Sequence, residues 1–256
     1  MFQVQKHPQR LKYKSIFDRV SHLRVLLDQG LKMGFGVLKT DANDSPIVAE
    51  YSYPPLVYLA GDSDTSEALA LVRSISPMQI IITPDDEWLQ LLKQELDPNL
   101  IPQKRWKLDH NSLDMIHLQS LIQSLDPRYT IEPLNREILT NCDRNFIRIM
   151  YTFHGTIDAF LEKYTGFCVL HEGRAVSMTY PGHPFENEFE IHIETIDSPE
   201  YRRKGLATAV GAKIIQDALD KGLIPHWDAA NEASVSLALK LGYTNPSEYF
   251  VHFLKQ

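Results

Sequence analysis

The spacing of apolar side chains divides the first half of the chain into helical and strand-like segments. In residues 1–28 they recur near helical spacing, at Leu11, Ile16, Val20, Leu23 and Leu27. This pattern predicts a helix that stops at Gly30. Short strand-like runs follow at 35–38, 48–53, 56–60 and 79–83. Helices are predicted at 65–75 and from Asp85 onward, so strand alternates with helix as in an α/β layer.

The second half of the chain begins where a strand pattern resumes at 129–134. Residues 97–128 before it predict a lesser strand, a helix and a connector, which places a domain boundary near residue 127. We therefore expect an N-terminal α/β domain over 1–127 and a second domain over 128–256. No internal repeat is evident in the sequence.

Within the second domain, the pattern predicts helical segments over 136–163 and then three strands separated by turns. The strands are predicted at 166–170, 175–180 and 188–196. A loop at 181–184 precedes the third strand, and a helix, a strand, a helix and a final strand at 248–254 follow it. The expected fold class is α/β (α+β), with a mixed, mainly antiparallel sheet flanked by helices.

Charge and cysteine content exclude several classes of protein. The formal net charge of −7 does not attract the chain as a whole to nucleic acid phosphates. No apolar run is long enough to cross a membrane, and the first residues lack the apolar core of a secretory signal. Either Cys142 or Cys168 could be a nucleophile, but an isolated cysteine is more often a small buried apolar residue. We expect a cytoplasmic protein with no metal, no nucleic acid partner and no membrane partner.

One basic segment is predicted to bind an anion. The strand ending at Ile196 leads into the turn Arg202–Gly205, and an amphipathic helix begins at Leu206. The first N–H groups of a helix have no partner within the helix and carry the positive end of its dipole. Gly205 lets the chain approach a phosphate closely, and the three cations of the turn add charge. The alternative is an ordinary solvated basic turn.

Residues 199–208 resemble the pyrophosphate-binding motif of the GNAT acetyltransferase superfamily, Gln/Arg-x-x-Gly-x-Gly/Ala, with Arg202, Gly205 and Ala207 at its defined positions. The resemblance, which spans about residues 129 to 256, implies a GNAT fold and acetyl-coenzyme A (acetyl-CoA) as cosubstrate. It implies that backbone N–H groups hold the pyrophosphate, namely those of Arg203, Lys204, Gly205, Leu206, Ala207 and Thr208. It also assigns Thr195 and Ile196 to coenzyme binding.

A second motif follows one helix later. Asn231 precedes a predicted helix that Gly242 closes, and this segment is similar to the GNAT pattern Asn-x-x-Ala-x-x-Leu-Tyr-x-Lys-x-Gly-Phe. The resemblance implies that Asn231 hydrogen-bonds the pantetheine arm and that Ser234 belongs to the coenzyme site; for Asn231 the alternative is a purely structural N-cap. Segments such as Gly166–Leu170 also resemble the branch that includes the zwittermicin self-resistance acetyltransferase.

The strand before the phosphate loop carries the candidate bases. Four polar side chains alternate along it and share one face, at Glu188, Glu190, His192 and Glu194. The opposite face is apolar and is predicted to be core. Acetyl transfer requires an ammonium group to lose a proton, which a carboxylate accepts directly or through water. The resemblance points to Glu190, and Glu194 lies nearer the thioester; the alternative is an exposed face without a catalytic role.

The expected activity is transfer of an acetyl group from acetyl-CoA to a primary amine of a small molecule. Where the family has a tyrosine that protonates the departing thiolate, this sequence has Ala238, and Tyr180, Tyr243 or Tyr249 could substitute. A non-catalytic acyl-coenzyme A sensor is the alternative, and acetylation of protein tails is a third hypothesis. Residues 1–127 carry no motif tied to chemistry; completing the acceptor cleft or forming a homodimer interface are their expected uses.

Overall fold

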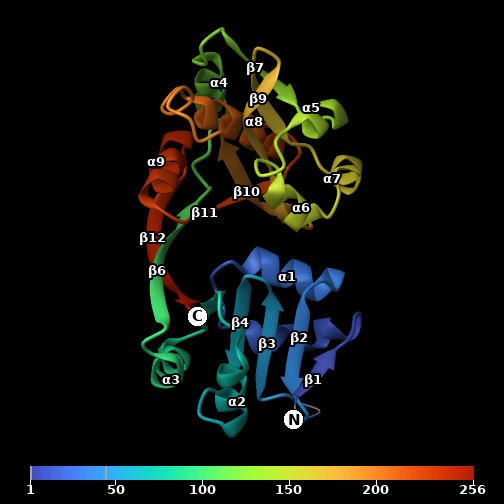
Figure 1. Cartoon of the computed structure of the whole chain (residues 1–256), viewed down its shortest axis with the longest axis vertical. Coiled ribbons are helices and arrows are strands. Elements are labelled where there is room, and N and C mark those ends of the chain that lie inside the picture. Colours follow the sequence, from blue (N-terminus) through green and yellow to red (C-terminus); the bar gives the residue numbers. More distant parts are fainter. Residues whose placement is uncertain (1, 44) are drawn as a thin grey trace. The chain divides into compact units, whose positions relative to one another are not determined.

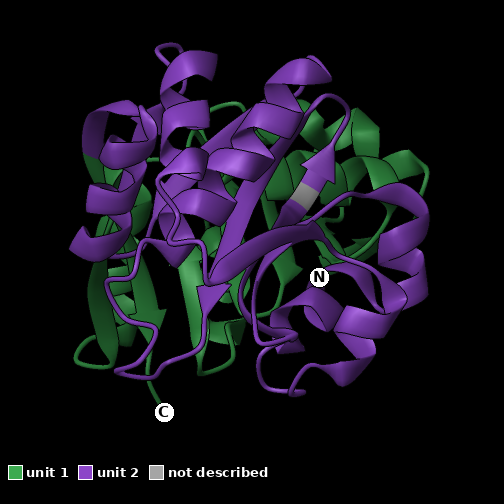
Figure 2. Cartoon of the chain, turned by 90° about the horizontal axis from the view of Figure 1, so that it is seen from above, with its two compact units in different colours: residues 1–105, 248–256 green, residues 106–247 purple. Residues whose placement is uncertain are grey.

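The computed structural model describes residues 2–43 and 45–256, and the chain divides into two compact units (Figure 2). Unit 1 comprises residues 1–105 and 248–256, and unit 2 comprises residues 106–247. The units therefore divide earlier than residue 127 and divide again near the C-terminus. That residues 1–127 and 128–256 fold as independent domains stays a prediction.

Unit 1 is a sheet with helices on both faces (Figure 1). Its elements are β1 (Phe2–Gln5), the 3-10 helix η1 (Gln9–Phe17), α1 (Arg24–Met33), β2 (Val37–Asp41), β3 (Val48–Tyr53), β4 (Leu56–Gly61), α2 (Ser66–Ser74), β5 (Gln79–Ile82), α3 (Asp86–Leu96) and the first part of β6 (Leu100–Asp109). The strand order is β1-β2-β3-β4-β5-β12, and β4 and β5 are parallel. One core lies under η1 and α1, and a second lies under α2 and α3.

The predicted helix over residues 1–28 is wrong. A strand, a 3-10 helix and a short α-helix occupy this segment instead. The apolar spacing gave a wrong prediction because Leu11 is exposed, whereas Arg10 is buried. The Arg10 guanidinium donates hydrogen bonds to the carbonyl oxygens of Gln5, Phe35 and Gly36. These contacts come from distant parts of the chain, so local spacing could not reveal them.

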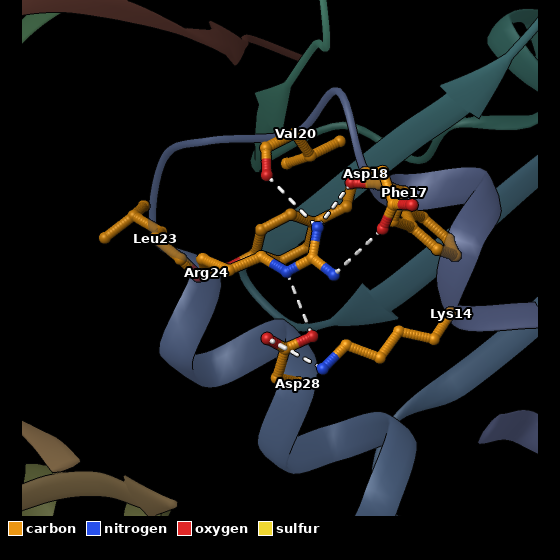
Figure 3. A network of polar contacts seen from close by, with 8 residues as sticks. Lys14, Phe17, Asp18, Val20, Leu23, Arg24 and Asp28 are labelled. Carbon is orange, nitrogen blue, oxygen red and sulfur yellow. Dashed lines mark hydrogen bonds and ion pairs between the residues drawn. The ribbon is translucent and has the colours of Figure 1, made fainter.

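Arg24 ties the two helical segments together (Figure 3). Its guanidinium donates to the carbonyl oxygens of Phe17 and Val20 and to the Asp28 carboxylate, at 2.9 Å from Nε. Gly30 does not stop the helix, which continues to Met33. A Cβ built on Gly30 would lie 1.7 Å from the Tyr51 hydroxyl oxygen, so glycine is required there by close packing.

Unit 2 repeats the same kind of layered structure. Its elements are the last part of β6, α4 (Met115–Gln123), β7 (Tyr129–Pro133), α5 (Arg136–Asn141), α6 (Arg148–His154), α7 (Ile157–Lys163), β8 (Phe167–His171), β9 (Arg174–Phe185), β10 (Glu188–Thr195), α8 (Leu206–Asp220), β11 (Ile224–Ala229), α9 (Glu232–Leu241) and the first part of β12 (Thr244–Leu254). The strand order is β6-β11-β10-β9-β8-β7. This mixed α/β fold, mainly antiparallel, is the predicted one.

The two faces of the unit 2 sheet have different helices. Helices α4, α8 and α9 pack with the apolar side of β10, where Phe189 is buried and Ile191 and Ile193 are partly buried. Helices α5, α6 and α7 pack against the other side through Cys168, Ala175 and neighbouring residues. The predicted loop at 181–184 is wrong, because β9 continues to Phe185 and pairs with β10.

The two units have the same order of elements, which the sequence did not reveal. Each runs strand, helical segments, three antiparallel strands, helix, a strand parallel to the third of these, and helix (Figure 1). Each also takes its last strand from the other half of the chain: His252 in β12 pairs with Ile81 in unit 1, and Leu108 in β6 pairs with Trp227 in unit 2. The chain is therefore a structural tandem repeat with exchanged terminal strands.

Candidate active site

Strands β10 and β11 part after a short parallel pairing. Their registered pairs are Glu188 with Ile224, Phe189 with Pro225 and Glu190 with His226. Beyond this point β10 pairs with β9 on its outer side, and β11 pairs with β6. Among the described residues, the inner edges of 191–195 and 227–229 have no registered strand partner. Backbone N–H and C=O groups along the inner edge of 191–195 can therefore bind an extended ligand.

The predicted phosphate loop connects the end of β10 to α8. Tyr201 anchors the loop, because its ring packs against the unit 2 core and its hydroxyl lies 3.3 Å from Nδ1 of His171. Arg203 and Gly205 have positive φ angles of 57° and 78°. Gly205 occupies the N-cap position of α8 and supplies no side chain to cap it. The first N–H groups of this long helix therefore lack both an intrahelical partner and a capping side chain.

Side chains of the loop separate into buried anchors and exposed cations. Leu206 and Thr208 are buried, whereas Arg203 and Lys204 are exposed. Arg202 is hydrogen-bonded to the Asp197 carboxylate, at 2.8 Å from its Nε. Ala207, between the buried anchors, is partly exposed. The six residues predicted to hold a pyrophosphate thus form one continuous turn at the positive end of a helix dipole.

The corresponding turn of unit 1 has the opposite character. Helix α2 follows β4 as α8 follows β10, but the Thr65 side chain caps it by accepting a hydrogen bond from the Ala68 N–H at 3.0 Å. Acidic residues surround this turn, at Asp62, Asp64 and Glu67. At the end of β4, the Gly61 carbonyl accepts a hydrogen bond from the indole of the fully buried Trp88. Only the unit 2 turn has the chemistry of a phosphate site.

The second motif folds as a capped helix. The Asn231 side chain accepts a hydrogen bond from the Ser234 N–H at 2.9 Å, and the Ser234 hydroxyl accepts one from the Trp227 indole at 3.1 Å. Asn231 is therefore an N-cap, and its amide nitrogen remains available to a ligand. Ala238 is fully buried in the core, so a tyrosine hydroxyl at this position would have to displace packed side chains.

Three polar atoms on the α5–α7 side of the sheet are buried without a hydrogen-bond partner among the described residues. They are the Tyr180 hydroxyl, Nε2 of His192 and Oε2 of Glu194. His192 lies opposite Tyr180 in the β9–β10 ladder, and their ring centroids are 4.8 Å apart. Nε2 of His192 lies 3.6 Å from Oε2 of Glu194. Unsatisfied polar groups are rare in protein interiors, so three together indicate a place for a ligand or water.

Other candidates for acid and base are engaged elsewhere. The Tyr243 hydroxyl donates to the Pro225 carbonyl at 2.8 Å inside the core, and Tyr249 stacks on His22 in unit 1. Glu188 is hydrogen-bonded to His226 at 2.8 Å. Burial, with a smaller contribution from the Glu194 charge, raises the pKa of Tyr180 above its ordinary value. The Tyr180 phenol therefore holds its proton at neutral pH.

A cavity of about 1020 Å³ lies beside the end of β10. Glu194, Thr195 and Ile196 form part of its wall, together with α5, the segment after α5 and the β8–β9 hairpin. Cys142 also lines it, but burial raises the pKa of this thiol. Burial raises the pKa of Cys168 to about 12. Both cysteines are therefore protonated thiols near neutral pH and are poor nucleophiles.

The fold and the phosphate turn together define an acyltransferase of the GNAT class. The sequence profile of the GNAT acetyltransferase family matches residues 17–252, so the chain belongs to this family. The matched region includes most of both units, whereas the motifs in the sequence had indicated only about residues 129 to 256. The chain is therefore a GNAT acetyltransferase, a transferase, along nearly its whole length.

Several known proteins are similar to this chain. An uncharacterised N-acetyltransferase of Bacillus subtilis, YdfB, is 24% identical over 210 residues, which are 77% of each protein. A GCN5-related N-acetyltransferase-like protein from Streptococcus suis has a TM-score of 0.81 at 24% identity, covering 98% of this chain and all of that one. A tandem GNAT protein from the clavulanic acid biosynthesis pathway has a TM-score of 0.62 at 10% identity, covering 98% and 97%. These likenesses extend over both units and show the shared fold.

No cluster of three or more side chains suited to a metal ion occurs among the described residues. Within the same residues, no helix has the length and apolarity needed to span a bilayer. The predicted site residues lie on β10 and directly after it, in the phosphate turn and at the start of α9. The sequence offered Tyr180 only as one of three possible substitutes for the family tyrosine, and it placed His192 on the polar face of β10 without a role of its own.

Proposed function

We propose that this protein transfers the acetyl group of acetyl-CoA to a primary amine of a small molecule. The observation that carries the proposal is the uncapped N-terminus of α8 beside the parting strands β10 and β11. Backbone N–H groups at a helix N-terminus favour phosphate, and a free strand edge favours the amide groups of a pantetheine arm. Family membership supports acetyl-CoA as the donor.

The proposed coenzyme contacts come from three segments. The N–H groups of residues 203–208 hold the pyrophosphate, while Thr195 and Ile196 continue the β10 edge toward it. The free amide nitrogen of Asn231 donates to the pantetheine arm. Ser234 contributes through the position of its hydroxyl beside Trp227. Acetyl-CoA, when bound, supplies the thioester that is attacked.

We assign the general base to Glu194, with Glu190 as the second candidate. An amine with a pKa near 10 must lose a proton before its nitrogen attacks the thioester carbonyl. Glu194 has a buried oxygen without a hydrogen-bond partner and lines the cavity. The ammonium group first loses one proton to solvent; a second proton passes from the attacking nitrogen to this carboxylate, directly or through one water, as the nitrogen–carbon bond forms.

We assign proton donation to the departing thiolate to Tyr180. The carbon–sulfur bond breaks, and sulfur takes a proton to become the free thiol, whose ordinary pKa is about 8.5. Tyr180 has a free hydroxyl and a raised pKa, and it takes the place of the tyrosine that Ala238 replaces. The proton on Glu194 is then passed to the Tyr180 phenolate, directly or through water, which restores the starting protonation state.

A non-catalytic acyl-coenzyme A sensor is the second candidate, favoured by the alanine at position 238. Thiol release from acetyl-CoA, measured with a library of primary amines, separates the two. Amine-dependent release of one thiol per acetylated amine is expected. Coenzyme binding by calorimetry without release to any amine would support the sensor instead.

Three finer statements accompany the proposal. The resemblance of segments such as Gly166–Leu170 favours the branch that includes the zwittermicin self-resistance acetyltransferase. The scarcity of cysteines favours a cytoplasmic location. Sedimentation of the full chain measures directly whether it forms the expected homodimer.

A further inference from the structure

The cavity beside β10 has features that the proposed coenzyme site does not use. Its wall is formed by residues from β7, α5, the segment between α5 and α6, the β8–β9 hairpin and residues 194–197. Thr195 and Ile196 belong both to this wall and to the proposed coenzyme contacts. A molecule in the cavity therefore lies next to the proposed coenzyme contacts of β10.

Carboxylates dominate the charge of the cavity wall. They are Glu132, Glu137, Asp143, Glu194 and Asp197. Asp197 is paired with Arg202. Among the described residues that line the cavity, Arg174 is the only cation. The remaining charge is negative, and a concave wall of one sign concentrates ions of the opposite sign. The cavity is therefore suited to a cation.

Apolar side chains lie between these carboxylates. Ile138, Phe146, Leu170 and Ala175 line the cavity, and Phe146 and Ala175 are almost completely buried. A small ion is not stabilised by an apolar wall. Methylene groups are stabilised when they leave water and pack against such a wall. The wall thus fits a molecule in which cationic groups alternate with short hydrocarbon segments.

The cavity wall contains one carboxylate oxygen that is buried without a hydrogen-bond partner in the described part of the chain, on Glu194, and two further such atoms lie outside the wall. Tyr180 is fully buried and its hydroxyl has no hydrogen-bond partner, like Nε2 of His192 and Oε2 of Glu194. Glu194 belongs to the cavity wall, and its charge acts on Tyr180. An amino group in the cavity can donate to the Glu194 carboxylate oxygen, so it satisfies this atom in a way that a hydrocarbon cannot.

We infer that the cavity binds an aliphatic amine with two or more ammonium groups, and that this is the acceptor class. The inference rests on the proposed acetyltransferase function. One amino group lies at Glu194, where it loses its proton and is acetylated. A second ammonium group, a few methylenes away, is held by the carboxylates of Glu132, Glu137 and Asp143. The second charge fixes which amine reaches the thioester.

Two amines of equal chain length test this inference. Acetyl transfer to 1,4-diaminobutane and to n-butylamine is measured with the full chain at saturating acetyl-CoA. We expect kcat/KM for the diamine to exceed that for the monoamine by about tenfold or more. Because the attraction is between charges, raising the salt concentration should reduce this ratio. Equal kcat/KM values would overturn the acceptor class and leave the acetyltransferase proposal intact.

A pair of variants locates the effect. Glu137→Gln should lower the diamine-to-monoamine ratio several-fold, because it removes a cavity carboxylate. Glu162→Gln removes the same charge from an exposed position in α7 outside the cavity wall and should leave the ratio unchanged. An equal fall in both variants would overturn the placement. If no amine is acetylated, calorimetry of 1,4-diaminobutane with the wild type and Glu137→Gln decides the binding inference separately from the catalytic one.

Discussion

Gly205 precedes α8 with a φ of +78°, and a Cβ built on it meets no protein atom within 4 Å. The open space is where the proposed pyrophosphate lies against the backbone. In Gly205→Val, the side chain should fill this space and strain the turn. We expect acetyl-CoA affinity to fall at least about tenfold, roughly 1.4 kcal/mol, in calorimetric titrations.

Gly222 offers a matched control for this substitution. It follows the same helix, has a φ of +67°, and also has open space around a Cβ. Gly222→Val should cause similar backbone strain without touching the proposed coenzyme site. Similar losses of affinity in the two variants would assign the effect to strain and count against the phosphate placement.

Glu194 is the residue on which the proposed chemistry depends. In Glu194→Gln, the amide cannot take a proton from the amine, so kcat should fall about 100-fold or more while acetyl-CoA affinity changes little. Glu190→Gln should be the next most damaging variant. Glu188→Gln is the control, because Glu188 is occupied by His226. Near-normal turnover in Glu194→Gln across neutral and alkaline pH would refute the assignment.

His154 should make the stability of the fold depend on pH. Burial lowers its pKa from about 6.5 to about 4, because the charged ring is poorly solvated between Phe160, Tyr164 and Tyr180. In the unfolded chain His154 therefore binds a proton below about pH 6.5, whereas in the folded chain it binds one only below about pH 4. The free energy of unfolding should fall across this window as pH decreases, by up to about 3 kcal/mol.

Urea denaturation of the wild type and of His154→Asn, at intervals between about pH 7.5 and 4.5, measures this contribution. The difference between their slopes isolates His154 from the carboxylates, which titrate in both proteins. Parallel curves would show that His154 is protonated in the folded protein as easily as in the unfolded chain.

At the scale of elements, α8 contrasts with α2. Both follow the third antiparallel strand of their unit, but α2 is capped by Thr65 and flanked by acids, whereas α8 is uncapped and preceded by Arg203 and Lys204. Replacing both cations by alanine should raise the dissociation constant for acetyl-CoA about tenfold and weaken its dependence on salt.

A double variant elsewhere controls for net charge. Lys6→Ala with Lys163→Ala removes two exposed cations, and neither position belongs to the phosphate turn. It should leave both the affinity and its salt dependence near the wild-type values. If the two double variants behave alike, long-range attraction by the whole surface would explain binding, and the turn would lose its special role.

The elements with strong local signals were predictable from the sequence. Thr65, Asp85 and Asn231 were placed at or near helix starts, and each caps its helix by accepting a backbone hydrogen bond three residues later. Strand β3 matches its predicted bounds because turns flank a clear apolar run. Such signals are local, so they survive without knowledge of tertiary contacts.

The candidate site was predictable only in part, for the same reason. The Glu190–Glu194 face and the phosphate turn are close in sequence, on β10 and between β10 and α8, so local patterns could indicate both. The buried polar atoms of Tyr180 and His192 have no hydrogen-bond partner among the residues that the structure describes. This property depends on all the side chains around them, so a local sequence pattern cannot predict it. The cavity likewise combines residues from separate elements. The repeat was hidden because the two equivalent turns now carry opposite charges.

At the scale of the whole molecule, the exchanged strands determine which fragments can fold. The unit 2 core contains Leu108 and Leu118, which lie before residue 128. A fragment of residues 128–256 lacks both and also leaves β11 without its β6 partner. We expect this fragment to show no cooperative unfolding transition, whereas residues 106–247 should fold and bind acetyl-CoA.

Thermal unfolding and coenzyme titration of the two fragments measure this. Cooperative folding of residues 128–256 would support independent domains joined near residue 127. Folding of residues 106–247 without coenzyme binding would show that unit 1 contributes contacts to the cosubstrate, contrary to the proposal that unit 2 holds it entirely.

The exchange of β12 also determines when the protein can mature during synthesis. Strand β5 emerges from the ribosome early, but its partner in β12, at residues 252–254, is made only after the whole of unit 2. Tyr249 and Val251, from the same strand, fill the core under η1 and α1. Until β12 has been made, unit 1 therefore has part of its core open and one strand edge unpaired. A stalled or truncated chain exposes that edge to other chains, so early termination should yield aggregates and not a folded N-terminal half.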